Sequence, residues 1–159
     1  MPFTSFPWPS RITEIDSEHE GVPLVTLMDI ITYPQVTAKF KCIARVVAAI
    51  PWKVEDFCSL RGTYRVRITL EDPTARLHAY VYDDDGEVFF DGYPPAEELT
   101  RKWDALLGLA HGESDGEIRG APRNPPWVLI CVKSYYISKS DIWGSRKFRI
   151  FRTKLLVEC

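Results

Sequence analysis

In TYRVRITLEDPTARLHAYVY, residues 63–82, apolar and polar side chains alternate on both sides of a turn that contains Pro73. A period of two is typical of a β-strand with one buried and one solvent-facing side. The stretch therefore predicts a β-hairpin with a continuous apolar face. Its apolar members are Tyr64, Val66, Ile68 and Leu70 before the turn, and Leu77, Ala79 and Val81 after it.

Three more segments extend this hairpin to five strands. AKFKCIARVVAAI, residues 38–50, precedes it, while PWVLICVKSYYIS, residues 126–138, and SRKFRIFRTKLL, residues 145–156, follow it. Between them, PPAEELTRKWDALLGLA, residues 94–110, carries an apolar stripe at helical spacing. The predicted order is strand, strand, strand, helix, strand, strand. A short helical turn is also expected after Thr26, an N-cap residue.

This order predicts an all-β fold with one α-helix, a five-stranded Greek-key barrel of the OB-fold type with the helix between strands 3 and 4. Other small barrels fit the strand pattern alone, and the position of the helix favours the OB-fold. A chain of 159 residues has the size of one domain. We expect residues 1–21 to form a partly ordered N-terminal arm and residues 22–159 to form a single domain.

The charges are divided unevenly along the chain, although the net charge is only −2. Between Glu71 and Glu117 there are 13 acidic residues and three basic ones, whereas residues 118–159 contain nine basic and two acidic residues. Such asymmetry can place one basic face on a nearly neutral molecule, which suits an anionic partner. A solvated surface without a partner explains the same pattern equally well.

The four cysteines are isolated, with no C-x-x-C pair and no short Cys/His spacing. This spacing argues against a structural zinc site. The sequence shows no signal peptide and no apolar run of about 18 residues, so we expect a reducing cytosolic or nuclear setting with free thiols. Cys42 and Cys131 fall within apolar strand patterns and are expected in the core.

Three stretches together resemble the C-terminal domain of the protection-of-telomeres family, which are single-stranded telomeric DNA-binding proteins, and most closely its plant members. They are VTAKFKCIARVVAAIPW, TYRVRITLEDPTARLHAYVYDDDGEVFFDGYP and PWVLICVKSYY. The resemblance extends from about Val22 to Val157, and the order and spacing of the three stretches make it specific.

The resemblance implies the C-terminal OB domain of a longer protein whose N-terminal OB domains read single-stranded telomeric DNA. It also implies a docking role in telomere maintenance, in the nucleus at the chromosome telomere, with telomerase, CST or a shelterin-like subunit as partner. Animal members insert a zinc ribbon and a resolvase-like domain after the first barrel strand, but here only residues 53–62 separate Trp52 from Thr63. This difference weakens any transfer of an animal interface to this chain.

A partner-binding surface is predicted at Tyr135, Tyr136 and Trp143. Trp and Tyr dominate the energetics of protein interfaces, and a Trp in the polar turn SDIWGS has little local core in which to be buried. In the alternative, Trp143 folds back onto Phe148 or Phe151.

A second candidate site is a nucleic-acid-binding face of basic and aromatic residues on the polar sides of the strands. Cations there would follow the phosphates, and stacking on aromatic rings contributes about 1–3 kcal/mol per base. Ordinary solvent-facing strands would show the same pattern, and the neighbouring acidic stretch favours that explanation, so direct single-stranded telomeric DNA binding by the OB groove is the alternative function. The candidates are Lys39, Lys41, Arg65, Arg67, Tyr80, Tyr82, Arg146, Lys147 and Arg149.

The sequence does not predict catalysis, a metal site or a cofactor. Asp83, Asp84 and Asp85 fit the solvated tip of a hairpin better than a calcium loop, which needs ligands at alternating positions and a distant Glu. His78 has no serine or cysteine partner nearby, so a hydrolase triad is not expected. We therefore expect a binding module that is not an enzyme and uses no cofactor.

Overall fold

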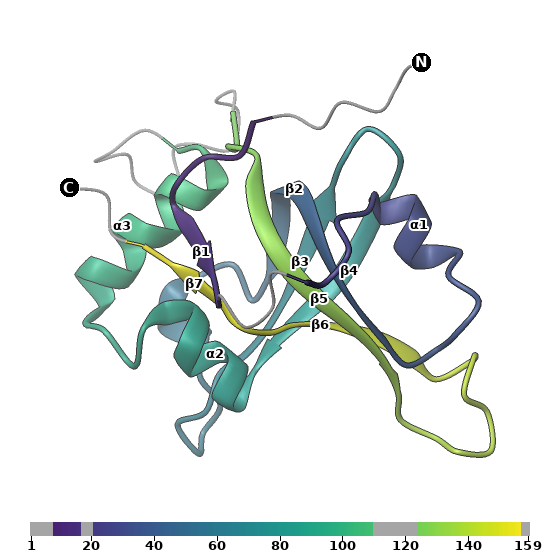
Figure 1. Cartoon of the computed structure of the whole chain (residues 1–159). Helices are drawn as coiled ribbons and strands as arrows, with labels where there is room; N and C mark the ends of the chain where they lie inside the picture. The colour runs from purple at the N-terminus through teal and green to yellow at the C-terminus, as the bar shows by residue number, and fades with distance from the viewer. Residues whose placement is uncertain (1–7, 17–20, 110–123, 157–159) are drawn as a thin grey trace.

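Five strands of the computed structural model close into one barrel, which occupies the centre of Figure 1. The structure describes residues 8–16, 21–109 and 124–156. The order around the barrel is β2-β3-β4-β6-β5, with a parallel contact between β4 and β6 and antiparallel contacts elsewhere. This order confirms the predicted five-stranded OB-fold barrel. The barrel strands are β2 Ala38–Ile50, β3 Arg65–Glu71, β4 Arg76–Tyr82, β5 Val128–Tyr136 and β6 Arg146–Ile150.

The hairpin of β3 and β4 has the predicted buried face. Its register pairs Val66 with Val81 and Ile68 with Ala79, and all four side chains are fully buried. Burial of one such aliphatic side chain contributes about 1.5–3 kcal/mol, and a slip of one residue would expose the whole set. The alternation in the sequence therefore sets the register of this hairpin.

Strand β2 carries a β-bulge that changes which of its residues face outward. Up to Val46 the strand alternates as predicted, but its register with β3 then shifts between Val46 and Ala48. Because the bulge adds a residue on one strand only, the alternation changes phase after it. Ala49 packs against the core, whereas Ile50 is 59% exposed. The bulge thereby places an apolar side chain on the outer surface of the barrel.

Helix α1, Leu27–Ile31, begins at Thr26 as predicted. The Thr26 hydroxyl accepts a 3.1 Å hydrogen bond from the N–H of Asp29, and the Asp29 carboxylate accepts one of 3.1 Å from the N–H of Thr26. This reciprocal pair is a capping box. The buried carboxylate of Asp72, after β3, accepts a 2.9 Å bond from the N–H of Leu27 and so holds α1 against the β3–β4 hairpin.

Two helices, α2 (Asp83–Phe90) and α3 (Ala96–Leu107), lie between β4 and β5, where one helix was predicted. The prediction of a solvated hairpin tip at residues 83–85 was wrong, because these aspartates form the first turn of α2. Acidic side chains are favourable there, since the N-terminus of a helix carries a partial positive charge. Helix α3 has the predicted apolar stripe, and its buried residues are Leu99, Lys102, Trp103, Leu106 and Leu107.

Gly86 allows α2 to approach the barrel closely. A Cβ atom at this position would lie 2.5 Å from the Cβ of Tyr64, whose side chain is buried. The Tyr64 hydroxyl donates a 2.7 Å hydrogen bond to the carbonyl of Gly92, just beyond α2, and burial raises the pKa of this tyrosine. Tyr64 therefore joins the start of β3 to both ends of α2.

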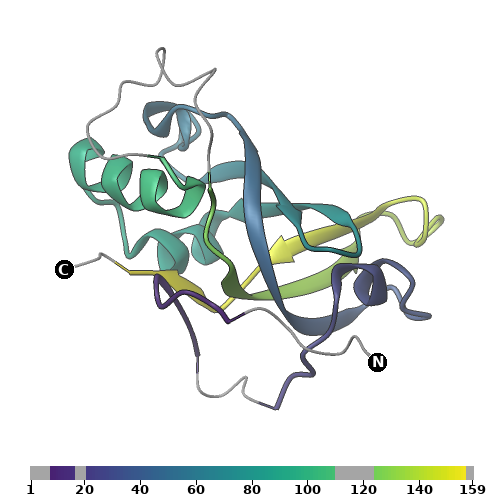
Figure 2. The same cartoon turned by 90° about the horizontal axis from the view of Figure 1, so that it is seen from above.

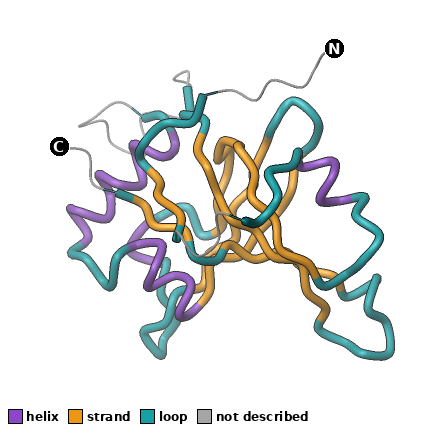
Figure 3. Tube along the Cα trace, in the orientation of Figure 1, coloured by secondary structure: helices purple, strands orange, loops and turns teal. Residues whose placement is uncertain are grey.

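Outside the barrel, β1 (Thr13–Ile15) and β7 (Thr153–Leu155) form a two-stranded antiparallel ribbon. The last predicted strand is divided into β6 and β7, with Arg152 between them at a φ of 49°. The ribbon, α2 and α3 lie on one side of the barrel, while α1 and the loop 137–145 lie on the other (Figures 1 and 2). Figure 3 shows the barrel strands crossing between these two groups.

The remaining sequence predictions concern the cysteines and the long loop. Cys42 and Cys131 are fully buried and free, as predicted, and burial raises the pKa of Cys131 to about 11. The composition of residues 111–126, rich in Gly, Pro and charged residues, predicts a long loop, and only residues 124–126 of it belong to the described part of the chain. None of the helices in that part has the length and apolar character that a bilayer crossing requires.

Candidate functional site

A shallow groove of about 400 Å³ lies on the outer face of β3 and β4. Arg65 lies opposite Tyr82 and Arg67 opposite Tyr80, so two cations and two rings share this face. The bulge in β2 adds Ile50, which is opposite Arg67. Four of the predicted nucleic-acid-binding residues therefore come together. We call this site the tyrosine groove; its lining residues are Ile50, Arg65, Val66, Arg67, Tyr80 and Tyr82.

The two tyrosines form an aromatic platform in this groove. Their ring centroids are 4.7 Å apart, with the planes inclined at 38°. The guanidinium of Arg65 lies 5.6 Å from the ring of Tyr82, and Nζ of Lys147 lies 5.9 Å from the ring of Tyr80. Burial raises the pKa of Tyr82 above its ordinary value. Aromatic rings next to cations are the combination that binds bases and phosphates of a single strand.

A row of side chains in register extends from the groove around the barrel. Its cation on β6, Arg149, is held by α2, because Oδ2 of Asp85 lies 2.6 Å from Nε of Arg149 and 4.0 Å from Nζ of Lys133. Lys39 and Lys133 both lie over the ring of Phe151, at 5.6 and 5.5 Å. The positive charge of the row is therefore partly neutralised from within the fold. The row consists of Ile50, Arg67, Tyr80, Arg149, Lys133 and Lys39.

Arg146 and Lys41 lie away from the tyrosine groove. The guanidinium of Arg146 donates hydrogen bonds of 2.9 and 2.8 Å to the carbonyls of Ile31 and Ile30 at the end of α1, and burial lowers its pKa. Lys41, on β2, is bonded through its backbone N–H and C=O to the segment 23–25. The structure places neither residue beside the aromatic platform.

The loop 137–145 presents Trp143 at the surface, where 51% of the residue is exposed. The Ser145 hydroxyl donates a 2.7 Å bond to the carbonyl of Asp141 and accepts a 2.9 Å bond from the N–H of Ser138. The Asp141 carboxylate accepts a 2.9 Å bond from the N–H of Gly144. The loop is thus held in one conformation by its own polar groups.

Trp143 is connected to Phe148 through a cation. The guanidinium carbon of Arg146 lies 5.3 Å from the centroid of the Trp143 ring and 4.8 Å from that of Phe148. Arg146 therefore contacts both rings, while about half of Trp143 remains exposed to solvent.

The structure separates the two tyrosines that were predicted together with Trp143. Tyr136 is opposite Arg146, while Tyr135 is opposite Lys147, and consecutive residues of a strand face opposite sides. Burial raises the pKa of Tyr135, on which Arg149, Tyr82 and Tyr80 also act electrostatically. Tyr135 therefore belongs to the side of the tyrosine groove, and Tyr136 to the side of Trp143.

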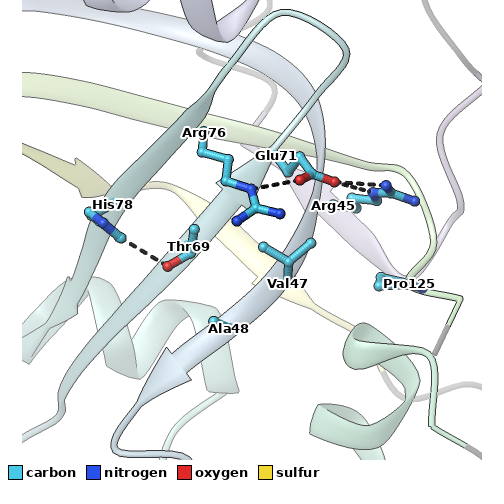
Figure 4. A pocket seen from close by; sticks show the side chains of 8 residues that line it. All are labelled: Arg45, Val47, Ala48, Thr69, Glu71, Arg76, His78 and Pro125. Carbon is cyan, nitrogen blue, oxygen red and sulfur yellow. Dashed lines mark hydrogen bonds and ion pairs between the residues drawn. The ribbon is translucent and has the colours of Figure 1, made fainter. Parts of the chain in front are cut away.

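A wider pocket of about 670 Å³ lies on the outer face of β2, β3 and β4 (Figure 4). Glu71 at its edge accepts a 2.7 Å bond from Nη2 of Arg45 and another of 2.7 Å from Nε of Arg76, and these two bonds lower the pKa of Glu71. The side chains of Thr69 and His78 are bonded at 2.9 Å. We call this site the arginine pocket. Neither arginine was among the predicted site residues, although both belong to the outward-facing series of their strands.

The aspartates at the start of α2 do not converge on a common point. Asp85 is paired with Arg149, and in residues 8–16, 21–109 and 124–156 no three His, Cys, Asp or Glu side chains come close enough to hold a metal ion.

Comparison with known proteins supplies the family context. The family model described as POT1A-like, OB fold domain matches residues 8–141. Protection of telomeres protein 1a of Arabidopsis thaliana is 50% identical over 157 residues, covering 97% of this chain and 32% of the relative. Protection of telomeres protein 1b of the same plant is 46% identical over 145 residues, covering 91% of this chain and 30% of the relative. The chain thus spans about a third of the length of these relatives.

Among solved structures, a chain in the crystal structure of fission yeast Pot1 and Tpz1 has the same architecture. It superimposes with a TM-score of 0.76, covering 94% of this chain and 100% of the other, at 16% sequence identity. At this identity the likeness shows the fold.

Proposed function

Since the chain belongs to the POT1A-like family of OB-fold domains, we propose that it acts in telomere maintenance as a non-enzymatic docking module for a telomere-associated protein. Its place is the nucleus, at the chromosome telomere. The partner classes are telomerase, the CST complex and a shelterin-like subunit. The fission yeast crystal structure is one of Pot1 and a second protein, Tpz1, which supports a protein partner for a domain of this fold.

The observation that carries the proposal is the exposed Trp143 on a loop that is already ordered. Interface hot spots are enriched in Trp and Tyr. Association costs roughly 0.5–1.5 kcal/mol for each flexible side chain that it immobilises, and a loop fixed by Ser145 and Asp141 avoids part of that cost. A pre-organised aromatic side chain of this kind is suited to anchor a partner.

Other exposed apolar side chains flank Trp143. Arg146 connects the loop to α1, because it contacts the Trp143 ring and binds the carbonyl of Ile31. The loop and the end of α1 therefore form one surface, which we call the tryptophan patch. Its members are Ile31, Tyr136, Ile137, Ile142 and Trp143.

A binding assay with two matched tryptophan variants tests the proposal. The purified domain is immobilised and exposed to recombinant telomerase, CST and shelterin-like components of the source organism. Trp143→Ala should weaken capture about tenfold or more, the effect of a hot-spot residue. Trp52→Ala is the control, since Trp52 is also 51% exposed and lies in the connection between β2 and β3. Equal capture by both variants and the wild type would refute the tryptophan patch.

Single-stranded telomeric DNA binding is the second candidate function, and the tyrosine groove favours it. Tyr80 and Tyr82 offer stacking surfaces, while Arg65, Arg67 and Lys147 stand beside them for the phosphates. In the OB-fold this pair of strands commonly forms the ligand face.

Titration with a G-rich telomeric oligonucleotide at several salt concentrations tests this second function. Phosphate contacts require that affinity fall steeply with salt, and Tyr82→Ala should remove a stacking contribution of about 1–3 kcal/mol. Tyr136→Ala is the control, because Tyr136 faces the other side. No binding by the wild-type domain at low salt would exclude this function.

A further inference from the structure

The geometry points to the arginine pocket as a phosphodiester-binding site that continues the tyrosine groove along the outer face of β2, β3 and β4. This inference rests on the second proposed function, single-strand binding, and names a contact that the groove alone does not supply. The ligand is the backbone of a single-stranded nucleic acid, with one phosphate at Arg76.

The pocket has an excess of positive charge that its own carboxylate does not cancel. Glu71 is the only acidic residue among those lining the pocket, and it is shared between two guanidinium groups. Both of its oxygens are occupied, one by Arg45 and the other by Arg76. One carboxylate against two arginines leaves a net charge of +1, which matches the single negative charge of a phosphodiester.

Arg76 has donors that face the pocket. Its bond to Glu71 uses Nε, and 69% of its side chain is exposed. In Figure 4 the terminal nitrogens of Arg76 point over the pocket toward Thr69 and Val47, while Arg45 lies on the other side of Glu71. A guanidinium presents its N–H groups in a planar fork that fits two oxygens of one phosphate. Glu71 therefore orients the guanidinium of Arg76 through Nε and leaves its two terminal nitrogens to bind a phosphate.

The pocket and the tyrosine groove lie on the same side of the same strands. On β4, His78 stands two residues from Tyr80, and Arg76 two residues further, so the three side chains share one face. On β3, Thr69 lies between Arg67 and Glu71 in the matching row. The path from Tyr80 to Arg76 measures about 14 Å along the strand.

The chemistry of this face favours a nucleic acid over an acidic peptide. A distance of about 14 Å corresponds to roughly four nucleotides at the duplex rise and to fewer in an extended strand. The face joins an aromatic platform at one end to an arginine fork at the other, with Thr69, His78 and the small side chain of Ala48 between them. A face that offers both aromatic rings and cations suits a ligand that carries both bases and phosphates.

The test compares salt dependence among three Arg76 variants and a control. Fluorescence anisotropy with single-stranded oligonucleotides gives the slope of log affinity against log salt for the wild-type domain. Arg76→Gln should reduce the slope by about 0.7, the value of one phosphate contact on a single strand. Affinity at low salt should fall roughly two- to fivefold, as for an exposed ion pair. Arg76→Lys should retain the slope, whereas Arg76→Glu should weaken binding further.

The length of the oligonucleotide locates the contact. When it is shortened until it covers only the tyrosine groove, Arg76→Gln and the wild type should bind equally well. Arg101→Gln, on the exposed side of α3, is the matched control and should leave the slope unchanged at every length.

Each contrary outcome identifies what fails. If the wild type binds oligonucleotides and Arg76→Gln has the same slope, the arginine pocket is not a phosphate site, and single-strand binding by the groove stands. If the wild type binds no oligonucleotide, the second function and this inference both fail. If a polyglutamate peptide binds through Arg76 while oligonucleotides do not, the pocket takes carboxylates and the inference is overturned.

Discussion

The guanidinium of Arg146 lies 5.3 Å from the centre of the Trp143 ring, while its terminal nitrogens donate to two carbonyls at the end of α1. One side chain thus fixes the orientation of the exposed tryptophan and joins the loop to a helix far away in the sequence. Arg146 is consequently a positioning residue of the tryptophan patch, although its charge alone suggested a nucleic-acid contact.

Replacement of Arg146 should destabilise the domain. Arg146→Ala removes two hydrogen bonds to carbonyls, a third of 3.0 Å to the Ser134 hydroxyl, and the contact with Trp143. Hydrogen bonds to a charged group each contribute about 1.5–3 kcal/mol, so we expect the free energy of unfolding to fall by about 2 kcal/mol or more. Urea denaturation measures it, with Lys147→Ala as the control. A similar loss in both variants would contradict this role.

Neutralisation of Asp85 should strengthen single-strand binding. Asp85→Asn releases Arg149 from its 2.6 Å ion pair and removes the acid that lies 4.0 Å from Lys133. We expect affinity for the oligonucleotide to rise roughly two- to fivefold at low salt, with a steeper salt dependence. Asp84→Asn, an exposed position one residue earlier in α2, serves as the control. An increase in both variants would indicate a general charge effect.

The pair of arginines on Glu71 should make stability depend on pH. Their hydrogen bonds hold the pKa of Glu71 below its ordinary value. The stabilisation is therefore complete above the pKa of the unfolded state, about 4.3, and is lost as pH falls through the lower folded pKa. Because Arg76 is well exposed, we expect less than about 1 kcal/mol. The stability difference between the wild type and Glu71→Gln should shrink between pH 6 and pH 3.5, and a constant difference over this range would contradict this role.

Gly86→Ala should destabilise the domain although alanine is the better helix former. The exchange favours the helix by about 1 kcal/mol, but the new Cβ would lie 2.5 Å from the Cβ of Tyr64. Overpacking of this kind costs about 1–3 kcal/mol. The Cβ of Tyr64 cannot move aside easily, because it is bonded directly to the backbone next to β3. Thermal unfolding should show a lower Tm than for Gly21→Ala, where nothing lies within 4 Å. A higher Tm would mean that α2 moves freely.

The hairpin could be predicted from the sequence because its alternation is complete. Strands β3 and β4 each bury one side and expose the other, so the alternation of apolar and polar residues specifies the register of their pairing. The bulge in β2 could not be predicted in this way. Simple alternation beyond Val46 would have placed Ile50 inside, and only the shifted pairing with β3 brings Ile50 to the groove. Likewise, DDDG is a typical turn composition, and the close approach of Tyr64 to Gly86 depends on contacts distant in sequence.

The candidate site residues show the same limit of prediction from sequence. Arg65, Arg67, Tyr80 and Tyr82 were found together because neighbouring strands place their outward series side by side. Arg149 and Arg146 differ, because their partners stand 64 and 116 residues away along the chain, at Asp85 and Ile30. A linear pattern shows the charge of a residue and leaves its partner undetermined.

The attachment of β1 and β7 to the barrel also determines how the domain responds to mechanical load. The Thr13 hydroxyl donates a hydrogen bond to the carbonyl of Leu129 on β5, and the Thr153 hydroxyl accepts one from the N–H of Cys131 on the same strand. Leu155 also belongs to the hydrophobic core. Tension applied between β1 and β7 must therefore break contacts with β5 in addition to the hydrogen bonds of the ribbon, so the ribbon and the barrel resist the load together.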